Sequence, residues 1–324
     1  MGPRSALAGL LTVFVVLIAS QGTAAAAAPA AAPPVAGPPA GGIAAPAAAG
    51  TDDGPVEDPP PDPLAESGAD LAPATDAARK PLAATTDLVR FFGTALAWID
   101  HGSFGLDRAR MVADRSAPKG RLLRVGYPAG SASPTVARSG AKSGGAQSYL
   151  RLPRSADAMT LTYSVRFQPG FKFVKGGKLP GLFGGDAGSG GHHKAAGFST
   201  RFMWRAAGAG EVYAYFPQAT GDGASLGRGR WRFTPGRWDR IAQRVVLNTP
   251  GRNNGTVTVW VNGRQVFTQG GLTYRTQGNV HIDGLFFSTF FGGGDRSWVS
   301  PTNQYVDFSG FSFVPVRGLG PGRP

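Results

Sequence analysis

The sequence predicts an all-β fold in which two antiparallel sheets pack as a sandwich. From about residue 120 onward, short segments alternate apolar and polar residues, the period of a strand with one buried face. β-branched and aromatic residues are frequent in these segments, glycine-rich turns separate them, and segments with a helical period are scarce. Many short strands in regular succession are typical of β-sandwiches.

The predicted strands share this alternation. They cover residues 146–152, 159–167, 198–205, 211–216, 237–248, 256–267, 284–291 and 305–316. Within residues 256–267, Asn262-Gly263 separates VTVWV from RQVF, and this dipeptide favours two-residue hairpin turns. Together with the preceding strand, this hairpin resembles the lectin-type jelly roll of concanavalin A-like domains.

Residues 1–85 differ in composition from the rest of the chain. Arg4 precedes an apolar run over residues 6–19, and small residues follow, which is typical of a cleaved signal peptide. The Ala, Pro and Gly that come next cannot bury enough apolar surface to fold and predict a disordered linker. The expected organisation is signal peptide 1–28, linker 29–85, β-domain 86–318 opening with a short helix, and disordered tail 319–324.

The apolar run is too short for a membrane span, which needs about 20 residues, and no second run of that length follows. We therefore expect a secreted protein without a membrane span, acting as a monomer. The chain contains no cysteine. This excludes disulfides, thiolate metal sites and cysteine nucleophiles.

Charge is distributed unevenly along the chain. Residues 1–90 hold nine acids and four bases, a net of −5, and residues 91–324 hold 11 acids and 29 bases, a net of +18. A strongly basic domain predicts a polyanionic partner: nucleic acid, an anionic membrane or wall polymer, or an acidic polysaccharide. The Arg-rich segment 227–237 would suit nucleic acid. For an exported protein, an acidic polysaccharide is the better expectation.

The polar residues that best suggest a catalytic site lie within residues 174–216. We expect segments 198–205 and 211–216 to form a hairpin closed by the five-residue loop 206–210. Aromatic and aliphatic residues of both strands then face the core. The side chains expected to face outward together, as the floor of a groove, are Ser199, Arg201, Met203, Arg205, Glu211, Tyr213 and Tyr215.

A five-residue loop also predicts the register of this hairpin. Arg205 would pair with Glu211, and Arg201 would lie opposite Tyr215. A guanidinium beside a phenol favours the phenolate and can lower its pKa by about 1–3 units. A tyrosine of this kind can act as a general base or acid nearer neutral pH.

Lys178 stands in the glycine-rich segment 176–181, which we expect to be a loop that lets a polymer approach the backbone. The residue types suit β-elimination on a polymer of uronic acids. That reaction needs a cation at the carboxylate, a base for the proton on C5 and an acid for the departing O4. The residues expected to supply these parts, without metal or other cofactor, are Lys178, Ser199, Arg201, Tyr213 and Tyr215.

Four ordered motifs resemble the polysaccharide lyase family 14, which includes alginate and glucuronate lyases: FVKGGKLPGLFGG, FSTRFMWR, GEVYAYFPQ and GLFFSTFFGGGDRSWVSP. The resemblance covers roughly residues 145–316 and implies a β-jelly roll that performs metal-independent β-elimination. It assigns the catalytic lysine to Lys178, the S-x-R motif to Ser199 and Arg201, and the Y-x-Y pair to Tyr213 and Tyr215. It gives Tyr215 the acid/base role.

The expected substrate-binding residues are Arg205, Glu211, His192, His193 and Arg230. The histidine pair lies in a glycine-rich loop and lacks a cluster of acids that would complete a metal site. Two alternatives remain open. One is a non-catalytic module that binds acidic polysaccharides on the same fold, and the other is a hydrolase of neutral glycans. The hydrolase would need two facing carboxylates, which the scattered acids do not suggest.

Overall fold

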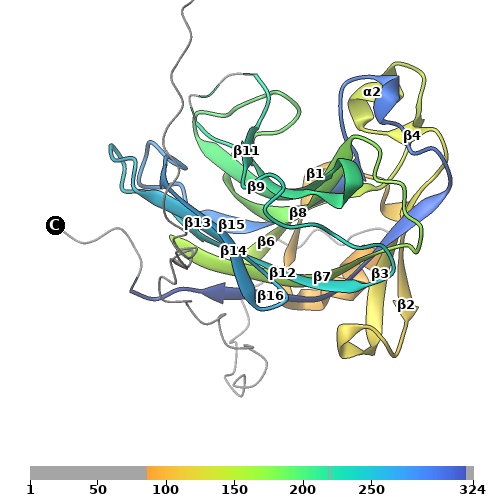
Figure 1. Cartoon of the computed structure of the whole chain (residues 1–324). Helices are drawn as coiled ribbons and strands as arrows, with labels where there is room; N and C mark the ends of the chain where they lie inside the picture. The colour runs from red at the N-terminus through yellow and green to blue at the C-terminus, as the bar shows by residue number, and fades with distance from the viewer. Residues whose placement is uncertain (1–85, 218, 220, 319–324) are drawn as a thin grey trace, which may run out of the picture. The chain divides into compact units, whose positions relative to one another are not determined.

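The computed structural model describes residues 86–217, 219 and 221–318. The predicted signal peptide, linker and tail lie outside these ranges. The described part is a sandwich of two antiparallel sheets, as the alternation predicted. Figure 1 shows the sheets face to face, with β8 and β9 in one layer and β7 and β12 in the other.

Each sheet has seven strands in the described ranges. Sheet A has the order β1 (Ala97–Phe104), β6 (Ala146–Ala156), β15 (Ile282–Phe291), β8 (Gly176–Gly185), β9 (Gly197–Arg205), β10 (Gly210–Tyr215) and β11 (Ala224–Leu226). Sheet B has the order β14 (Arg264–Leu272), β13 (Gly255–Val261), β12 (Trp238–Val246), β7 (Ala158–Phe167), β16 (Gln304–Pro315), β3 (Arg121–Tyr127) and β2 (Ala109–Ala113).

Short elements complete the fold. They are the helices α1 (Asp87–Phe92) and α2 (Pro134–Arg138), the parallel pair β4 (Ser131–Ala132) and β5 (Lys142–Ser143), and the 3₁₀ turns η1 (Gly93–Ala95), η2 (Leu106–Arg108), η3 (Pro118–Gly120), η4 (Ala206–Gly208) and η5 (Arg296–Trp298). Every predicted strand is present, and α1 is the expected opening helix. Strands β1 and β2, upstream of residue 120, were not predicted.

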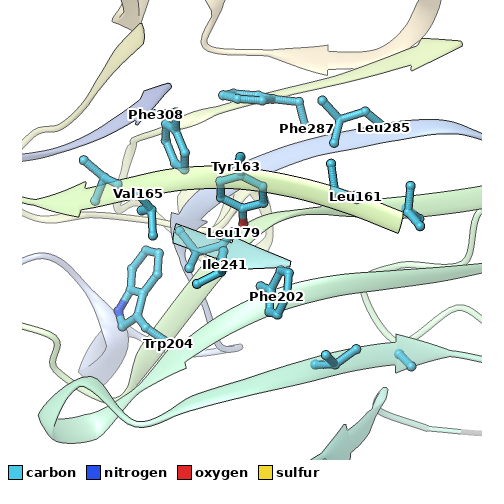
Figure 2. Packing of buried hydrophobic residues seen from close by; sticks show 14 of the residues in the cluster. Leu161, Tyr163, Val165, Leu179, Phe202, Trp204, Ile241, Leu285, Phe287 and Phe308 are labelled. Carbon is cyan, nitrogen blue, oxygen red and sulfur yellow. The ribbon is translucent and has the colours of Figure 1, made fainter. Parts of the chain in front are cut away.

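The apolar faces of the two sheets meet in one core, seen from close by in Figure 2. Phe202 and Trp204 of β9 contribute from sheet A, and Tyr163 and Val165 of β7 contribute from sheet B, all with no exposed surface. Burying each such side chain stabilises the fold by about 1.5–3 kcal/mol. This core determines which face of β9 points away from it, and that face carries the candidate site.

The glycine-rich segment around Lys178 is a strand rather than the expected loop. β8 pairs with β15 on one side and with β9 on the other, in the middle of sheet A. Glycine suits this position because the neighbouring backbones and rings approach closely: a Cβ on Gly177 would lie 2.1 Å from the Trp204 ring. The register shifts at Pro180, which has no N–H for the ladder, and the carbonyl of Pro180 accepts a hydrogen bond from the Tyr163 hydroxyl at 3.0 Å.

The β9–β10 hairpin has a tighter turn than predicted. The Arg205 amide donates to the Ala209 carbonyl, so the loop holds the three residues of η4 instead of five. Ala207 and Gly208 both adopt left-handed conformations, with φ of 54° and 75°. The predicted register is therefore wrong by two residues. Because side chains alternate with a period of two, the same residues still share the face away from the core.

Candidate active site

The predicted polar residues form three rows across the outer face of β8, β9 and β10. Residues that are directly paired on neighbouring strands share a face. The rows are Lys178–Met203–Glu211, Gly181–Arg201–Tyr213 and Phe183–Ser199–Tyr215. Arg201 thus lies opposite Tyr213, and the predicted opposition of Arg201 and Tyr215 is wrong.

This face is covered rather than open. The exposed fractions are 9% for Lys178, 1% for Arg201, 7% for Tyr213 and 2% for Tyr215. Backbone amides of Gly191 and Gly223 contact the two tyrosines, as described below. The predicted grouping of these side chains is correct, but the expectation of a solvent-exposed face is not.

Arg201 is a buried cation without a carboxylate partner in the described residues. Its Nη1 donates to the Ser288 hydroxyl at 3.2 Å, while its Nε and Nη2 are buried and have no hydrogen-bond partner. The guanidinium carbon lies 4.5 Å from the centre of the Phe286 ring and 5.7 Å from that of Tyr215. Leaving buried donors unpaired is costly, so this arrangement suits an anionic ligand that supplies the missing acceptors.

Two residues that sequence reasoning missed support Arg201. The Ser288 hydroxyl of β15 donates to Oε1 of Gln147 on β6 at 3.2 Å, and the Gln147 amide nitrogen donates to the Gly102 carbonyl at 2.8 Å. The alternation in segment 146–152 does place Gln147 on the outer face. Only the pairing of β6 with β15, and of β15 with β8, brings it to the site.

Lys178 is held among aromatic, thioether and cationic groups. Its Nζ lies 3.3 Å from the centre of the Tyr213 ring and 3.1 Å from the Met203 sulfur. Burial lowers the pKa of Lys178 well below its usual value, and the charges of Arg201 and Arg205 lower it further. Its amine is therefore neutral at a lower pH than that of an exposed lysine.

The two tyrosines contact each other edge to face, with ring centres 5.6 Å apart. Backbone amides donate to both hydroxyls, Gly223 to Tyr213 at 3.0 Å and Gly191 to Tyr215 at 2.9 Å. Burial, with the neighbouring Tyr215, raises the pKa of Tyr213 well above its usual value. The sequence placed Arg201 opposite Tyr215. The structure places it opposite Tyr213, where burial favours the protonated phenol and not the phenolate.

The loop before β9 contacts the site through His193 and Ser199. Nδ1 of His193 lies 2.8 Å from the Phe216 carbonyl, so this nitrogen carries a proton and donates it; in the tautomer protonated only there, Nε2 is an acceptor. Nε2 is buried without a partner, and the ring centre lies 4.8 Å from that of Tyr215. His192 is exposed. The Ser199 hydroxyl donates to the Gly188 carbonyl at 2.7 Å and so ties the loop to β9.

Glu211 and Arg205 form a buried ion pair at one side of this face. Oε1 of Glu211 accepts from Nε and Nη2 of Arg205 at 2.8 and 2.6 Å, and the Glu211 side chain has no exposed surface. Its other oxygen lies 3.9 Å from Nε of the exposed Arg228. Arg230 is exposed and no polar contact links its side chain to the site. Arg228, rather than Arg230, approaches the predicted residues.

Most acids that carry a side-chain contact in the described residues have partners of their own, and Asp114 and Asp307 share Arg166. Asp307 is bonded to Arg124 and Arg166, Asp283 to Ser155, and Glu211 to Arg205. In the described ranges, no three His, Asp or Glu side chains cluster as metal ligands would. Within the same ranges, no helix is both long and apolar enough to cross a bilayer.

The comparisons with known proteins show that this β-sandwich, with lysine, arginine and paired tyrosines on the outer face of one sheet, is a polysaccharide lyase. The chain belongs to the polysaccharide lyase 14 family, whose model matches residues 115–311. The match begins about 30 residues upstream of the resemblance noted in the sequence.

One solved structure gives the same assignment, and a second gives the same fold. An alginate lyase of this family from Aplysia kurodai is 33% identical, with a TM-score of 0.62, over 72% of this chain and 95% of the other. The alginate lyase vAL-1 from Chlorella virus is 23% identical, with a TM-score of 0.61, over 72% of this chain and 99% of the other, and supports the fold. No curated protein sequence matches the chain.

Proposed function

We propose that this lyase cleaves a uronic-acid polymer of the alginate or glucuronan type by β-elimination, and that it acts outside the cell. The observation that carries the proposal is Arg201, a buried guanidinium with two unpaired nitrogens and no acid partner in the described residues. A substrate carboxylate is the ligand that would satisfy it, and the planar fork of arginine matches a carboxylate with two parallel hydrogen bonds.

Neutralising this carboxylate makes the proton on C5 of the sugar removable. A base takes that proton, the electron pair forms the C4–C5 double bond, the C4–O4 bond breaks, and an acid protonates O4. Tyr215 is proposed as the acid/base residue. Its hydroxyl lies in the row next to Arg201 and is held by the Gly191 amide.

Lys178 and Tyr213 complete the proposed chemistry. Because burial and nearby cations lower the pKa of Lys178, its amine can accept a proton or stabilise the enolate-like intermediate. The raised pKa of Tyr213 keeps its hydroxyl protonated, so Tyr213 serves as a hydrogen-bond donor. Ser199 acts indirectly, because its hydroxyl is engaged by the Gly188 carbonyl.

The proposed scheme places a protein cation, Arg201, at the carboxylate, where some lyases would use a metal ion. We therefore expect activity to survive exhaustive chelation with EDTA. Loss of activity on chelation, restored by one divalent cation, would show that Arg201 does not suffice.

The decisive experiment is product analysis on a panel of polyuronates: polymannuronate, polyguluronate, alginate and glucuronan. Each cleavage creates an unsaturated uronate that absorbs in the ultraviolet. We expect absorbance to rise with wild type on at least one polymer, and Tyr215→Phe to lower the rate by about 10²–10⁴-fold. Tyr274→Phe is the matched control, since it removes a hydroxyl that bonds the Thr256 carbonyl in the core.

A wild-type protein that binds a polyuronate but never shortens it would instead support a non-catalytic binding module. Export is tested separately. The mature protein should accumulate in the culture medium of its host with its amino terminus near residue 29. Protein that stays inside the cell with Met1 intact would contradict the secreted location.

A further inference from the structure

A depression lined by several polar side chains lies on sheet B, on the opposite side of the core from the candidate active site. It has a volume of about 320 Å³, and its lining includes Arg108, Arg110, Arg124, Gln168, Asn303 and Tyr305. Arg124 alternates along β3 with the core residues Leu123 and Val125, so it faces outward from sheet B. Lys178 and Arg201 lie on the outer face of sheet A. The two sites therefore cannot hold the same sugar residue.

Two arginines stand directly opposite each other in this depression. Arg110 of β2 is paired with Arg124 of β3, and like charges opposed across strands are destabilising. Arg124 is compensated, because its Nε and Nη2 donate to the two oxygens of Asp307 at 2.7 and 3.1 Å. Arg110 is exposed, and within the described ranges it has no acid or other polar partner. Arg110, whose charge has no partner, thus lies opposite Arg124, whose guanidinium is held by Asp307.

The Arg124 guanidinium is held by an aromatic ring as well as by the ion pair. The Arg124 head group lies 3.8 Å from the centre of the Tyr305 ring, and Asp307 below it has no exposed surface. Nη1 of Arg124 remains available for a ligand. Because the arginine is already ordered by the stack and the ion pair, little rotamer entropy would be lost when an anion binds.

The rest of the lining offers hydrogen-bond donors and an open floor. The Asn303 carbonyl oxygen accepts from the Ala129 amide at 2.8 Å, which leaves the amide nitrogen of Asn303 free to donate. The floor includes Gly126, where a Cβ would meet nothing within 4 Å, so the glycine leaves space above β3. Guanidinium and amide donors around an open floor suit a ligand with a carboxylate and several hydroxyls.

We propose that this depression is a second binding site for acidic polysaccharide, with a uronate carboxylate held between Arg110 and Arg124. The choice of ligand rests on the proposed function, whereas the site itself rests on the opposed arginines. Nucleic acid fits less well. Base stacking needs a free aromatic face, and the aromatic ring at the rim, Tyr305, is covered by the Arg124 guanidinium.

A polymer long enough to occupy both faces would be retained by two contacts, whereas a short oligomer would occupy one. The second contact then becomes intramolecular and raises the apparent affinity for long chains only. The expected signature is a dependence of KM on chain length that disappears when the second site is removed, while kcat stays unchanged.

The test uses the full chain with Arg110→Gln and Arg110→Glu. Arg110 is exposed and unpaired, so its replacement should not disturb folding, whereas replacing Arg124 would strip a partner from buried Asp307. Arg252→Gln is the matched control: Arg252 is exposed, has no side-chain partner in the described residues, and lies in the β12–β13 connection. KM and kcat are measured on polyuronate and on tetramers, and binding is measured by retardation in gels containing the polymer.

We expect Arg110→Gln to raise KM on the polymer about three- to tenfold, the loss of one charge-assisted contact. Arg110→Glu should have a larger effect, and tetramer kinetics should match wild type for both. The second site would be overturned if Arg110→Gln and Arg252→Gln had the same KM on the polymer, or if Arg110→Gln raised KM equally on polymer and on tetramers. So would Arg110-dependent retardation by DNA with none by polyuronate. If no polymer is cleaved but its retardation still depends on Arg110, the second site stands and the proposed lyase reaction falls.

Discussion

Lys178 and Tyr213 are in cation–π contact, although they belong to β8 and β10 and β9 runs between them. Nζ of Lys178 lies 3.3 Å from the centre of the Tyr213 ring, and the lysine has no acid within ion-pair distance in the described residues. Burial and the nearby arginines favour the neutral form of this amine, whereas the ring face stabilises its charged form. This contact therefore links the chemistry of the site to the stability of the fold.

The first prediction concerns the pH dependence of stability. The unfolded lysine keeps its proton up to about pH 10.5, whereas folded Lys178, with its lowered pKa, releases its proton earlier. Between these two pKa values the unfolded state holds more protons, so wild-type stability rises with pH. Lys178→Met removes this dependence and should be more stable than wild type at neutral pH. The difference in Tm should shrink as pH approaches 10.5.

Thermal unfolding between pH 6 and 10 measures this effect. Each kcal/mol of difference in the free energy of unfolding shifts Tm by about 2–4 °C. Lys172→Met is the matched control, because Lys172 is exposed and its side chain has no partner in the described ranges. Parallel pH curves for wild type, Lys178→Met and Lys172→Met would contradict the lowered pKa.

The second prediction tests the carboxylate fork. Arg201→Lys keeps the positive charge but loses the planar pair of donors. We expect kcat/KM on polyuronate to fall by about 10²–10³-fold, as when a preorganised donor to a developing charge is removed. The equivalent change at an exposed position, Arg252→Lys, should leave the kinetics unchanged. Activity of Arg201→Lys within threefold of wild type would mean that charge alone suffices.

The third prediction concerns the ion pair of Glu211 and Arg205. Because Glu211 is fully buried, we expect it to position Arg205 rather than to contact substrate. Glu211→Gln leaves Arg205 without its charged partner and should destabilise the protein by up to about 3 kcal/mol. KM should rise about fivefold to tenfold, a loss of about 1–1.4 kcal/mol in binding, with kcat nearly unchanged.

The double variant Arg205→Gln/Glu211→Gln separates stability from binding. Removing both charges should restore most of the Tm, since neither is then left buried alone, while KM stays high. If kcat instead falls with KM unchanged in Glu211→Gln, the residue acts in the chemical step and the positioning role is wrong.

The fourth prediction uses the two adjacent histidines as a matched pair. His193 lies against Tyr215 and bonds the Phe216 carbonyl, whereas His192 is exposed. We expect His193→Ala to lower kcat/KM about tenfold, the loss of one hydrogen-bonded contact in the site, and His192→Ala to have no effect. His193→Asn keeps a donor near the Phe216 carbonyl but lacks the acceptor Nε2. Full activity of His193→Asn would show that the histidine only anchors its loop, and equal losses in both alanine variants would contradict the distinction.

Alternation in the sequence was enough to predict the strands and to group Ser199, Arg201, Tyr213 and Tyr215 on one face, because a period of two is a local property of the chain. It was not enough for the register. The register depended on η4, where Ala207 adopts a left-handed conformation. Alanine rarely adopts this conformation, so the residue type did not predict it. The turn shortened by two residues, and Tyr213 moved opposite Arg201.

By itself, the sequence determined the all-β class, the basic charge of the domain and the outer-face side chains of the central hairpin, since composition and period need no long-range information. Only the tertiary structure brought Ser288 to Arg201 from 87 positions away, and Gln147 to Ser288 from 141. Only the tertiary structure showed that backbone covers the site and that Arg110 lies opposite Arg124 on sheet B. The physical reason is that strand pairing across such separations is decided by the whole core, and burial, which shifts the pKa of Lys178, exists only once that core has formed.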